Sequence, residues 1–286
     1  MFLSALITVL VLAVAFWLVK RRAADPYGDF HIELNRVGRD ATTEWLNMGW
    51  WKHTQVFPEA CEALALKLVQ AARLKPRSRV LDVGHGSGES LLFLLSHPSV
   101  PRPAHLTGIT SLPAHHKRSQ ARLSRLNSTI PVVLHVGDAV YRPGVRDHPL
   151  NGPRFDHIVA LDCAYHFNSR RDFMRQAFHA LDQGGSLALA DICFAPGTLQ
   201  SLRTRCIMAV LRLMPSVNAI STDEYVAQMH EIGFREVELE DISVDVFPSF
   251  IAFLERTGAG WAIFGRVLGL YYSAGARFVV VRGTRM

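Results

Sequence analysis

Cysteine is scarce in this 286-residue chain, and its cysteines form no CxxC pair or other spacing typical of metal ligands or redox motifs. The four are Cys61, Cys163, Cys193 and Cys206. Three of them lie in apolar runs, where a cysteine usually packs as a small hydrophobic residue. The histidines show no metal-ligand spacing either. The sequence therefore indicates no disulfide framework, predicts no metal site and is compatible with a reducing compartment.

The chain also lacks internal repeats, low-complexity tracts and a basic stripe interleaved with aromatic residues. Its formal net charge is +6, but the basic residues are dispersed. Such a charge fits an anionic membrane surface or a solvated face better than a nucleic-acid interface, so we expect no nucleic-acid partner. Apolar residues make up 49% of the chain, enough to build the core of one large α/β domain or two small ones.

Charged residues are absent from Phe2 to Val19, a stretch that as a helix would span roughly 27 Å. Three basic residues follow at positions 20–22, which by the positive-inside rule places the rest of the chain in the cytoplasm. We therefore expect residues 1–22 to be a single-pass membrane anchor, in the endoplasmic reticulum if the source is eukaryotic. The alternative is a signal peptide cleaved near residues 13–15, but no basic residue precedes the apolar run.

Short β-rich runs then alternate with helical ones, which predicts a doubly wound, mostly parallel sheet covered by helices on both faces. The expected strands are Arg79–Val83, His105–Ile109, Val132–Val136, Phe155–Leu161, Ser186–Ile192, Arg235–Ile242 and Arg277–Arg282. The expected helices include Pro58–Arg73, Glu89–Leu95, His116–Leu126 and Arg171–Leu181. Two further apolar segments are either core helices or helices at a bilayer interface, namely Leu199–Met214 and Gly260–Tyr272.

A glycine-rich turn links the first of these strands to the helix that follows it. Gly84, Gly86 and Gly88 alternate there, and glycine permits positive φ and close approach of the backbone to a ligand. A dinucleotide-binding turn would place its last glycine where Glu89 stands. It would also have an acidic residue after the second strand, where this chain has hydroxyl side chains. The pattern therefore disfavours a nicotinamide cofactor.

With Asp82 inside the preceding strand, this turn resembles the first motif of the class I S-adenosylmethionine-dependent methyltransferases. Further motifs of that family follow in order between residues 76 and 195: Gly137-Asp138-Ala139, Phe155–Val159 and Leu181–Leu187, in which Gln183 replaces the usual proline. The resemblance implies a seven-stranded sheet whose last strand inserts antiparallel. It also implies that the cofactor is S-adenosyl-L-methionine.

Shorter motifs are similar to those of sterol, tocopherol and cyclopropane-type methyltransferases. They are Gly108–Ser111, Asp162–Phe167, Asn47–Trp51 and Thr222–Tyr225. By this resemblance residues 23–57 form a linker and a cap over the cofactor, and residues 58–286 form the methyltransferase domain.

The resemblance also implies a set of cofactor-binding residues: Asp82, Gly84, Gly86, Gly88, Thr110, Ser111, Asp138, Ala139, Asp162, Asn47 and Trp50. For each residue the alternative is an ordinary structural role, such as a helix-capping carboxylate for Asp82. His166 is the candidate general base and Tyr165 a ring facing the cationic centre, because both follow the fourth strand at the edge of the sheet where ligands bind. The alternative for His166 is a packed or capping histidine. Residues 115–118 are expected to form a solvated helix start.

These observations predict methyl transfer to a lipophilic or amphipathic small molecule by a membrane-anchored enzyme. Whether carbon, oxygen or nitrogen is methylated stays open. The alternatives are a non-catalytic, membrane-tethered scaffold with the same fold, a nicotinamide-dependent oxidoreductase, and a nucleic-acid or protein methyltransferase.

Overall fold

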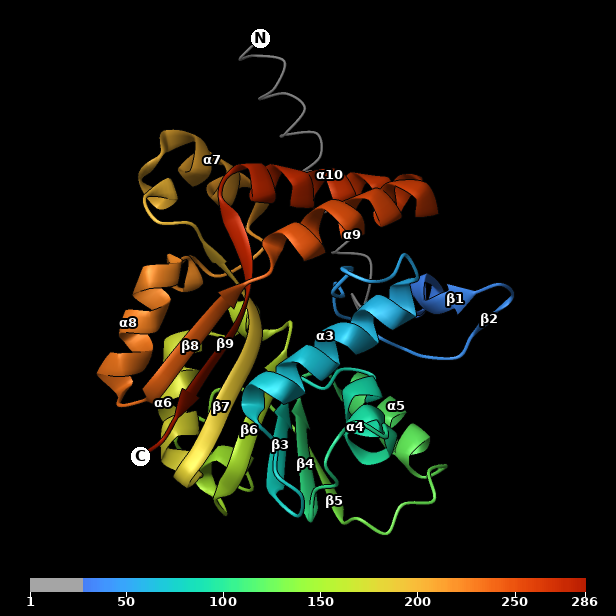
Figure 1. The fold of residues 1–286 in the computed structure, drawn as a ribbon, viewed down its shortest axis with the longest axis vertical. Coiled ribbons are helices and arrows are strands. Elements are labelled where there is room, and N and C mark those ends of the chain that lie inside the picture. Colours follow the sequence, from blue (N-terminus) through green and yellow to red (C-terminus); the bar gives the residue numbers. More distant parts are fainter. Residues whose placement is uncertain (1–27) are drawn as a thin grey trace.

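The computed structural model describes residues 28–286, which form a seven-stranded sheet with helices on both faces (Figure 1). The strands are ordered β5-β4-β3-β6-β7-β9-β8. Their bounds are β3 Arg79–Val83, β4 His105–Thr110, β5 Val132–Val136, β6 Phe155–Leu161, β7 Leu181–Phe194, β8 Arg235–Asp241 and β9 Ala276–Thr284. β9 lies antiparallel between β7 and β8, whereas β3 to β7 run parallel. The predicted α/β architecture and its antiparallel last strand are confirmed.

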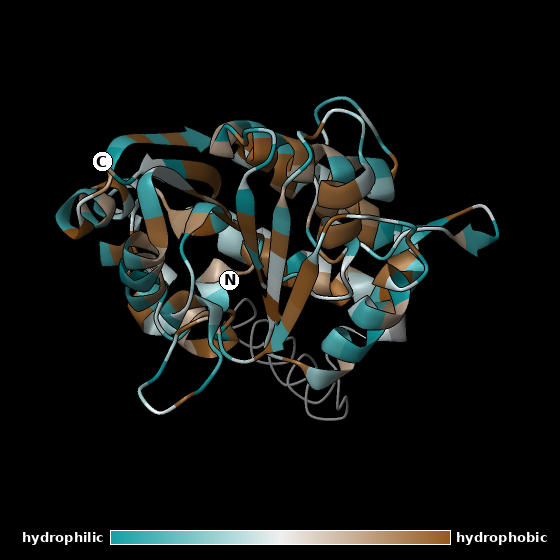
Figure 2. Ribbon diagram, turned by 90° about the horizontal axis from the view of Figure 1, so that it is seen from below, coloured by the Kyte–Doolittle hydropathy of each residue, from teal (hydrophilic) through white to brown (hydrophobic). Residues whose placement is uncertain are grey.

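The sheet divides the apolar core into two clusters, and helices cover one cluster on each face. On one face lie α3 (Phe57–Ala72), α4 (Glu89–Ser96), α7 (Leu202–Leu211), α9 (Ser243–Thr257) and α10 (Ala259–Ser273). On the other lie α6 (Arg170–Ala180) and α8 (Thr222–Ile232). α5 (Pro113–Leu123) packs beside β4 and β5. Apolar residues are concentrated in the central strands and polar ones in the outer helices and loops (Figure 2).

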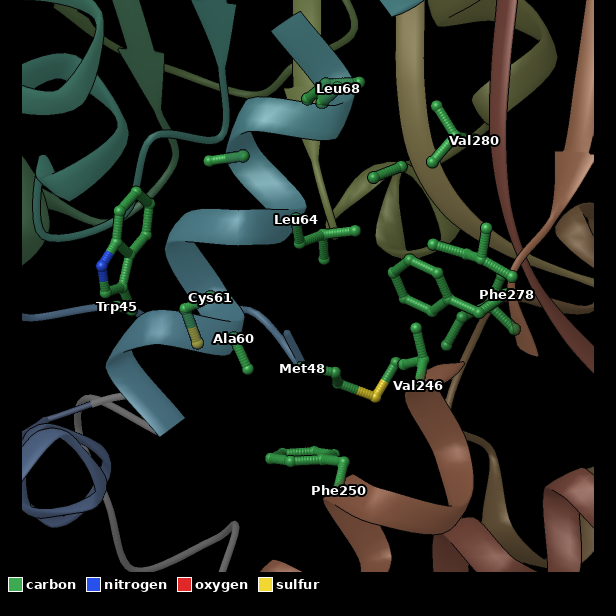
Figure 3. Packing of buried hydrophobic residues seen from close by; sticks show 14 of the residues in the cluster. Trp45, Met48, Ala60, Cys61, Leu64, Leu68, Val246, Phe250, Phe278 and Val280 are labelled. Carbon is green, nitrogen blue, oxygen red and sulfur yellow. The ribbon is translucent and has the colours of Figure 1, made fainter. Parts of the chain in front are cut away.

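The segment before α3 is built into the first of these clusters. A short helix, α2 (Asp29–Ile32), and a two-stranded hairpin, β1 (Arg36–Val37) with β2 (Asp40–Ala41), precede it. Trp45 and Met48 are then buried with Leu64 of α3 and with residues of α9 and β9 (Figure 3). Each large side chain buried in this way contributes on the order of 1.5–3 kcal/mol. The segment that the sequence predicts to be a cap is therefore held in place by the core.

Two helices differ from expectation, and a third decides between two alternatives. α5 begins at Pro113 rather than His116, because proline suits the first turn of a helix, where its missing N–H leaves no hydrogen bond unmade. α9 was missed, and it contains Pro248. α10 buries Trp261 and Tyr271 in the core, which favours the core alternative for that segment over a bilayer interface.

The predicted membrane localisation is corrected. A spanning helix needs about 20 mainly apolar residues. None of the helices in residues 28–286 is long and apolar enough to cross a membrane; α3, for example, has 16 residues. The predicted anchor, residues 1–22, lies outside the described residues. The prediction of a membrane localisation was therefore wrong for the part of the chain that the structure describes.

Candidate active site

The glycine turn follows β3 at the carboxyl edge of the sheet. The amide of Gly84 donates to the carbonyl of Ile109, 2.8 Å away, which ties the turn to the end of β4. Gly84, Gly86 and Gly88 have φ values of 79°, 53° and 92°. A Cβ atom at Gly84 would lie 2.6 Å from the Cys163 sulfur, and one at Gly88 would lie 2.7 Å from Ser119 Cβ. Backbone conformation and lack of space both require glycine at these two positions.

Two buried carboxyl groups flank the turn. Asp82 in β3 accepts a 2.6 Å hydrogen bond from Ser90 Oγ, and burial raises the pKa of Asp82 to about 7. Asp162, which follows β6 with a φ of 55°, accepts from the amide of Met48 through Oδ2 at 2.7 Å. Burial, with a smaller contribution from Asp191, raises the pKa of Asp162 to about 8. Its Oδ1 is buried and receives no backbone hydrogen bond, and a hydrogen bond between the Tyr165 side chain and this carboxyl group partly offsets the rise in its pKa. Ionised, such a buried carboxyl group fits a cationic ligand such as an α-ammonium group.

The other predicted cofactor residues of the sheet lie at the carboxyl ends of β4 and β5. Thr110 is buried, and its carbonyl accepts from the amide of Gly137 at 3.0 Å. Ser111 is exposed directly after it, and Ala139 is buried. Asp138 is exposed, and its Oδ1 accepts from the amide of Val140 at 3.0 Å, so it shapes its own loop. The structure brings these residues to the edge that holds the glycine turn, where their contacts with a cofactor stay a prediction.

Asn47 and Trp50 of the cap have partners within the protein. Asn47 Oδ1 accepts from the amide of Gly49 at 2.9 Å, and this side chain therefore shapes the turn of the cap. The Trp50 indole N–H donates to Asp245 of α9 at 3.3 Å, and its ring faces Lys67 of α3. Both contacts are structural, and a cofactor role for these residues stays a prediction.

A cluster of charged residues that the sequence reasoning missed fastens the cap to the glycine turn. Glu89 Oε2 accepts from the amide of Glu44 at 2.7 Å and forms an ion pair with Arg122. Arg118 pairs with the Glu44 carboxylate at 2.6 Å, and Ser87 Oγ donates to the Glu44 carbonyl at 2.6 Å. The four-residue spacing of Arg118 and Arg122, which places them on one face of α5, was the available signal.

Two histidines are buried beside this turn. His115 was expected in a solvated helix start, but it is buried, and its Nδ1 lies 3.9 Å from where a Cβ atom at Gly86 would be. The prediction was wrong because α5 begins earlier and turns this residue inward. Burial lowers the pKa of His85 to about 4, so it is neutral, and its Nδ1 lies 3.1 Å from the Gly86 carbonyl oxygen. Within residues 28–286 no group of three ligating side chains could hold a metal ion.

A cavity of about 850 Å³ opens beside the ends of β6 and β7. Its lining residues come from the short 3-10 helix Ala164–His166 and from the α7 region: His166, Leu199, Arg205, Met208, Ala209, Arg212, Leu213, Met214, Pro215, Ser216 and Ala219. Tyr165 does not line it but packs on His166, with ring centroids 4.1 Å apart. The volume suits a small organic molecule. The structure therefore places the candidate base at a cavity of the size that an acceptor needs.

A buried polar network joins the two walls of this cavity. Arg170 pairs with Asp191 at 2.7 Å, and the Tyr225 hydroxyl donates to the same Asp191 oxygen at 2.7 Å. Arg170 Nη2 also donates to the Asn218 carbonyl at 2.6 Å. The Asn218 side chain in turn donates to the carbonyls of Tyr165 and Phe167, which flank His166. The network thereby holds the turn that carries His166.

Comparison with known proteins adds to this geometry. A family model described as a methyltransferase domain matches residues 50–239. The erythromycin 3''-O-methyltransferase of Saccharopolyspora erythraea is 29% identical over 253 residues, covering 84% of this chain and 79% of that protein. The 27-O-demethylrifamycin SV methyltransferase of Amycolatopsis mediterranei is 29% identical over 216 residues, covering 74% and 75%. Geranyl diphosphate C-methyltransferase from Streptomyces coelicolor A3(2) has a similar fold, with a TM-score of 0.68 at 16% identity over 92% of this chain and 99% of that one.

Proposed function

The chain belongs to the class I S-adenosylmethionine-dependent methyltransferases, and we propose that it methylates a hydroxyl group of an apolar or amphipathic small molecule. The family match covers residues 50–239 and includes the glycine turn. The family match argues against the nicotinamide-dependent alternative. Glu89, which stands where a dinucleotide-binding turn would have a glycine, instead accepts a hydrogen bond from the Glu44 amide of the cap. The observation that carries the proposal for the acceptor is that His166 lines the cavity of about 850 Å³.

The residues of the turn fit the cofactor. S-adenosylmethionine, when bound, supplies an electrophilic methyl group on a sulfonium. The backbone of the turn at Gly84, Gly86 and Gly88 would hold its methionine part, and Asp162 would offer a buried carboxylate oxygen to its ammonium group. Thr110, Ser111 and Asp138 would bind the adenosine part at the ends of β4 and β5.

The acceptor is held in the cavity by apolar contacts, and His166 accepts the proton of its hydroxyl group as the oxygen becomes a nucleophile. Orientation supplies the rest of the rate enhancement, because a well-placed pair of reacting atoms gains an effective concentration far above that in solution. One relative is an erythromycin 3''-O-methyltransferase, and the name of another gives its substrate as 27-O-demethylrifamycin SV. Both names support oxygen over carbon or nitrogen as the methylated atom.

The test is an acceptor screen with purified full-length protein and labelled S-adenosylmethionine. The panel contains neutral and anionic forms of macrolide glycosides, polyketide alcohols and terpenoid alcohols, together with matched amines. We expect O-methyl products and S-adenosylhomocysteine in equal amounts. His166→Gln should lower kcat while leaving S-adenosylhomocysteine binding unchanged. Methylation confined to amines or to carbon would overturn the proposal, as would transfer by Gly86→Asp at the wild-type rate.

A further inference from the structure

The cavity beside His166 carries positive charge on an otherwise apolar wall. Its ionisable lining residues are His166, Arg205 and Arg212, and no carboxylate lines it. Arg205 and Arg212 are exposed, and neither forms an ion pair with a carboxylate of the described residues. Arg212 Nε donates to the carbonyl of Ala209 at 3.2 Å, which leaves its terminal amino groups available. The two guanidinium groups are therefore uncompensated at the wall of this cavity.

The positions of these arginines follow the helix. Arg205, Met208 and Ala209 have the spacing i, i+3 and i+4, so they share one face of α7. Arg212 follows directly after the helix with a φ of 46°, and all four residues line the cavity. Arg203, by contrast, lies off this face and donates to Ser273 Oγ of α10 at 3.1 Å.

The remaining lining residues describe the body of the ligand. Leu199, Leu213, Pro215 and Ala219 offer apolar surface, and Met208 and Met214 add flexible side chains that adapt to irregular shapes. Such a wall binds an apolar skeleton. A neutral skeleton alone would leave two arginines facing it without a partner.

We infer that the methyl acceptor combines an apolar body with an anionic group, a carboxylate, sulfate or phosphate, that Arg205 and Arg212 bind. Guanidinium groups bind such oxyanions with paired hydrogen bonds, which are stronger than those between neutral groups. The acceptor hydroxyl then faces His166 across the cavity from α7. The inference rests on the proposed methyl transfer for the identity of the ligand as acceptor, but the binding site can be tested without turnover.

The test compares two fluorescent probes that share an anilinonaphthalene skeleton. 1-Anilinonaphthalene-8-sulfonate carries a sulfonate, and N-phenyl-1-naphthylamine is neutral. Full-length protein should bind the sulfonate probe about tenfold more tightly, as expected for one charge-assisted pair, and added salt should reduce the difference. The double variant R205Q/R212Q should lose this preference but keep its affinity for the neutral probe, which shows that the cavity is intact. Arg203→Gln, the matched control on the same helix, should behave as the wild type.

Two further measurements locate the site and distinguish the anion. Ala209→Trp should fill the cavity and weaken the binding of both probes. Dodecyl phosphate and dodecanoate should displace the sulfonate probe at lower concentration than dodecanol does. Equal affinity for the two probes, or a preference that survives R205Q/R212Q or Ala209→Trp, would overturn the inference. Because these measurements need no transfer, they are independent of the acceptor screen. Failure of that screen with intact probe selectivity would reject the proposed reaction and leave the anion site.

Discussion

The amide of Met48 donates a 2.7 Å hydrogen bond to Asp162, a residue 114 positions further along the chain. This bond joins the cap to the end of β6, beside the glycine turn. It engages Oδ2 of the carboxyl group and leaves Oδ1 buried without a backbone donor. Because the Met48 hydrogen bond favours the ionised carboxylate, the position of the cap affects the pKa of Asp162.

Binding of the cofactor should release a proton. With a pKa of about 8, Asp162 is mostly protonated in ligand-free protein at pH 7, yet an ammonium group requires the carboxylate. The affinity for S-adenosylhomocysteine should therefore rise as pH rises from 6 to 8. Calorimetry in buffers of different ionisation enthalpy measures the release, which Asp162→Asn should abolish and Asp82→Asn should retain. Constant affinity over this range would contradict the assignment.

The raised pKa of Asp162 also predicts how the stability of the ligand-free protein depends on pH. The pKa of Asp162 is raised in the folded state, so unfolding releases its proton between the ordinary value near 4 and about 8. Its contribution therefore becomes less favourable to folding as pH rises across that window. Asp162→Asn should show a smaller decrease in Tm than the wild type between pH 5 and pH 8. An identical dependence in the two proteins would show that this group does not titrate as described.

Gly86 offers a test that separates stability from ligand approach. It has a φ of 53°, and an added Cβ atom would lie 2.8 Å from the Leu46 side chain. Gly86→Ala should cost about 1–2 kcal/mol in unfolding free energy and lower cofactor affinity. The double variant G86A/L46A removes the contact with Leu46, but cofactor affinity should stay low. Gly144→Ala, also at positive φ but with open space around it, is the control and should leave affinity unchanged.

The charged cluster over the turn should govern retention of the cap. Arg122→Ala removes the partner of Glu89, whose other contact is the Glu44 amide. We expect S-adenosylhomocysteine to bind about tenfold more weakly, the equivalent of ~1.4 kcal/mol, and proteolysis in residues 38–46 to accelerate. Arg125→Ala, on the exposed side of the same segment, should change neither. Unchanged proteolysis in Arg122→Ala would mean that the cap is held without the ion pair between Arg122 and Glu89.

The buried pair of Arg170 and Asp191 should dominate local stability. Arg170→Met would leave Asp191 buried beside Tyr225 without its cation, which typically costs about 3–5 kcal/mol in unfolding free energy. Arg171→Met breaks an exposed pair with Glu231 and should cost less than about 1 kcal/mol. Denaturant titration measures both. A similar, small loss in the two variants would show that the network is not a structural requirement.

Strands and the glycine turn were readable from the sequence because their signals are local. β3, β5 and β6 match the expected ranges. β3 and β6 are central strands and are largely apolar runs bounded by turn residues. β5 is a partly exposed edge strand, but its valines still favour extended backbone. β7 was predicted too short at its start, because Leu181 already pairs with Phe155 of β6 although Leu181–Gly185 has the composition of a turn. The antiparallel last strand came from the family resemblance.

The sequence by itself determined the fold class, the glycine turn after β3 and the edge of the sheet where that turn lies, because these depend on periodicity and on glycines at fixed spacing. Only the tertiary structure decided which charges meet. Glu44 reaches Glu89 across 45 positions, and Arg170 contacts Asn218 across 48. It likewise decided that Arg205 and Arg212 share a cavity with His166. Contacts between distant segments arise from the packing of whole elements, and no local pattern encodes that packing.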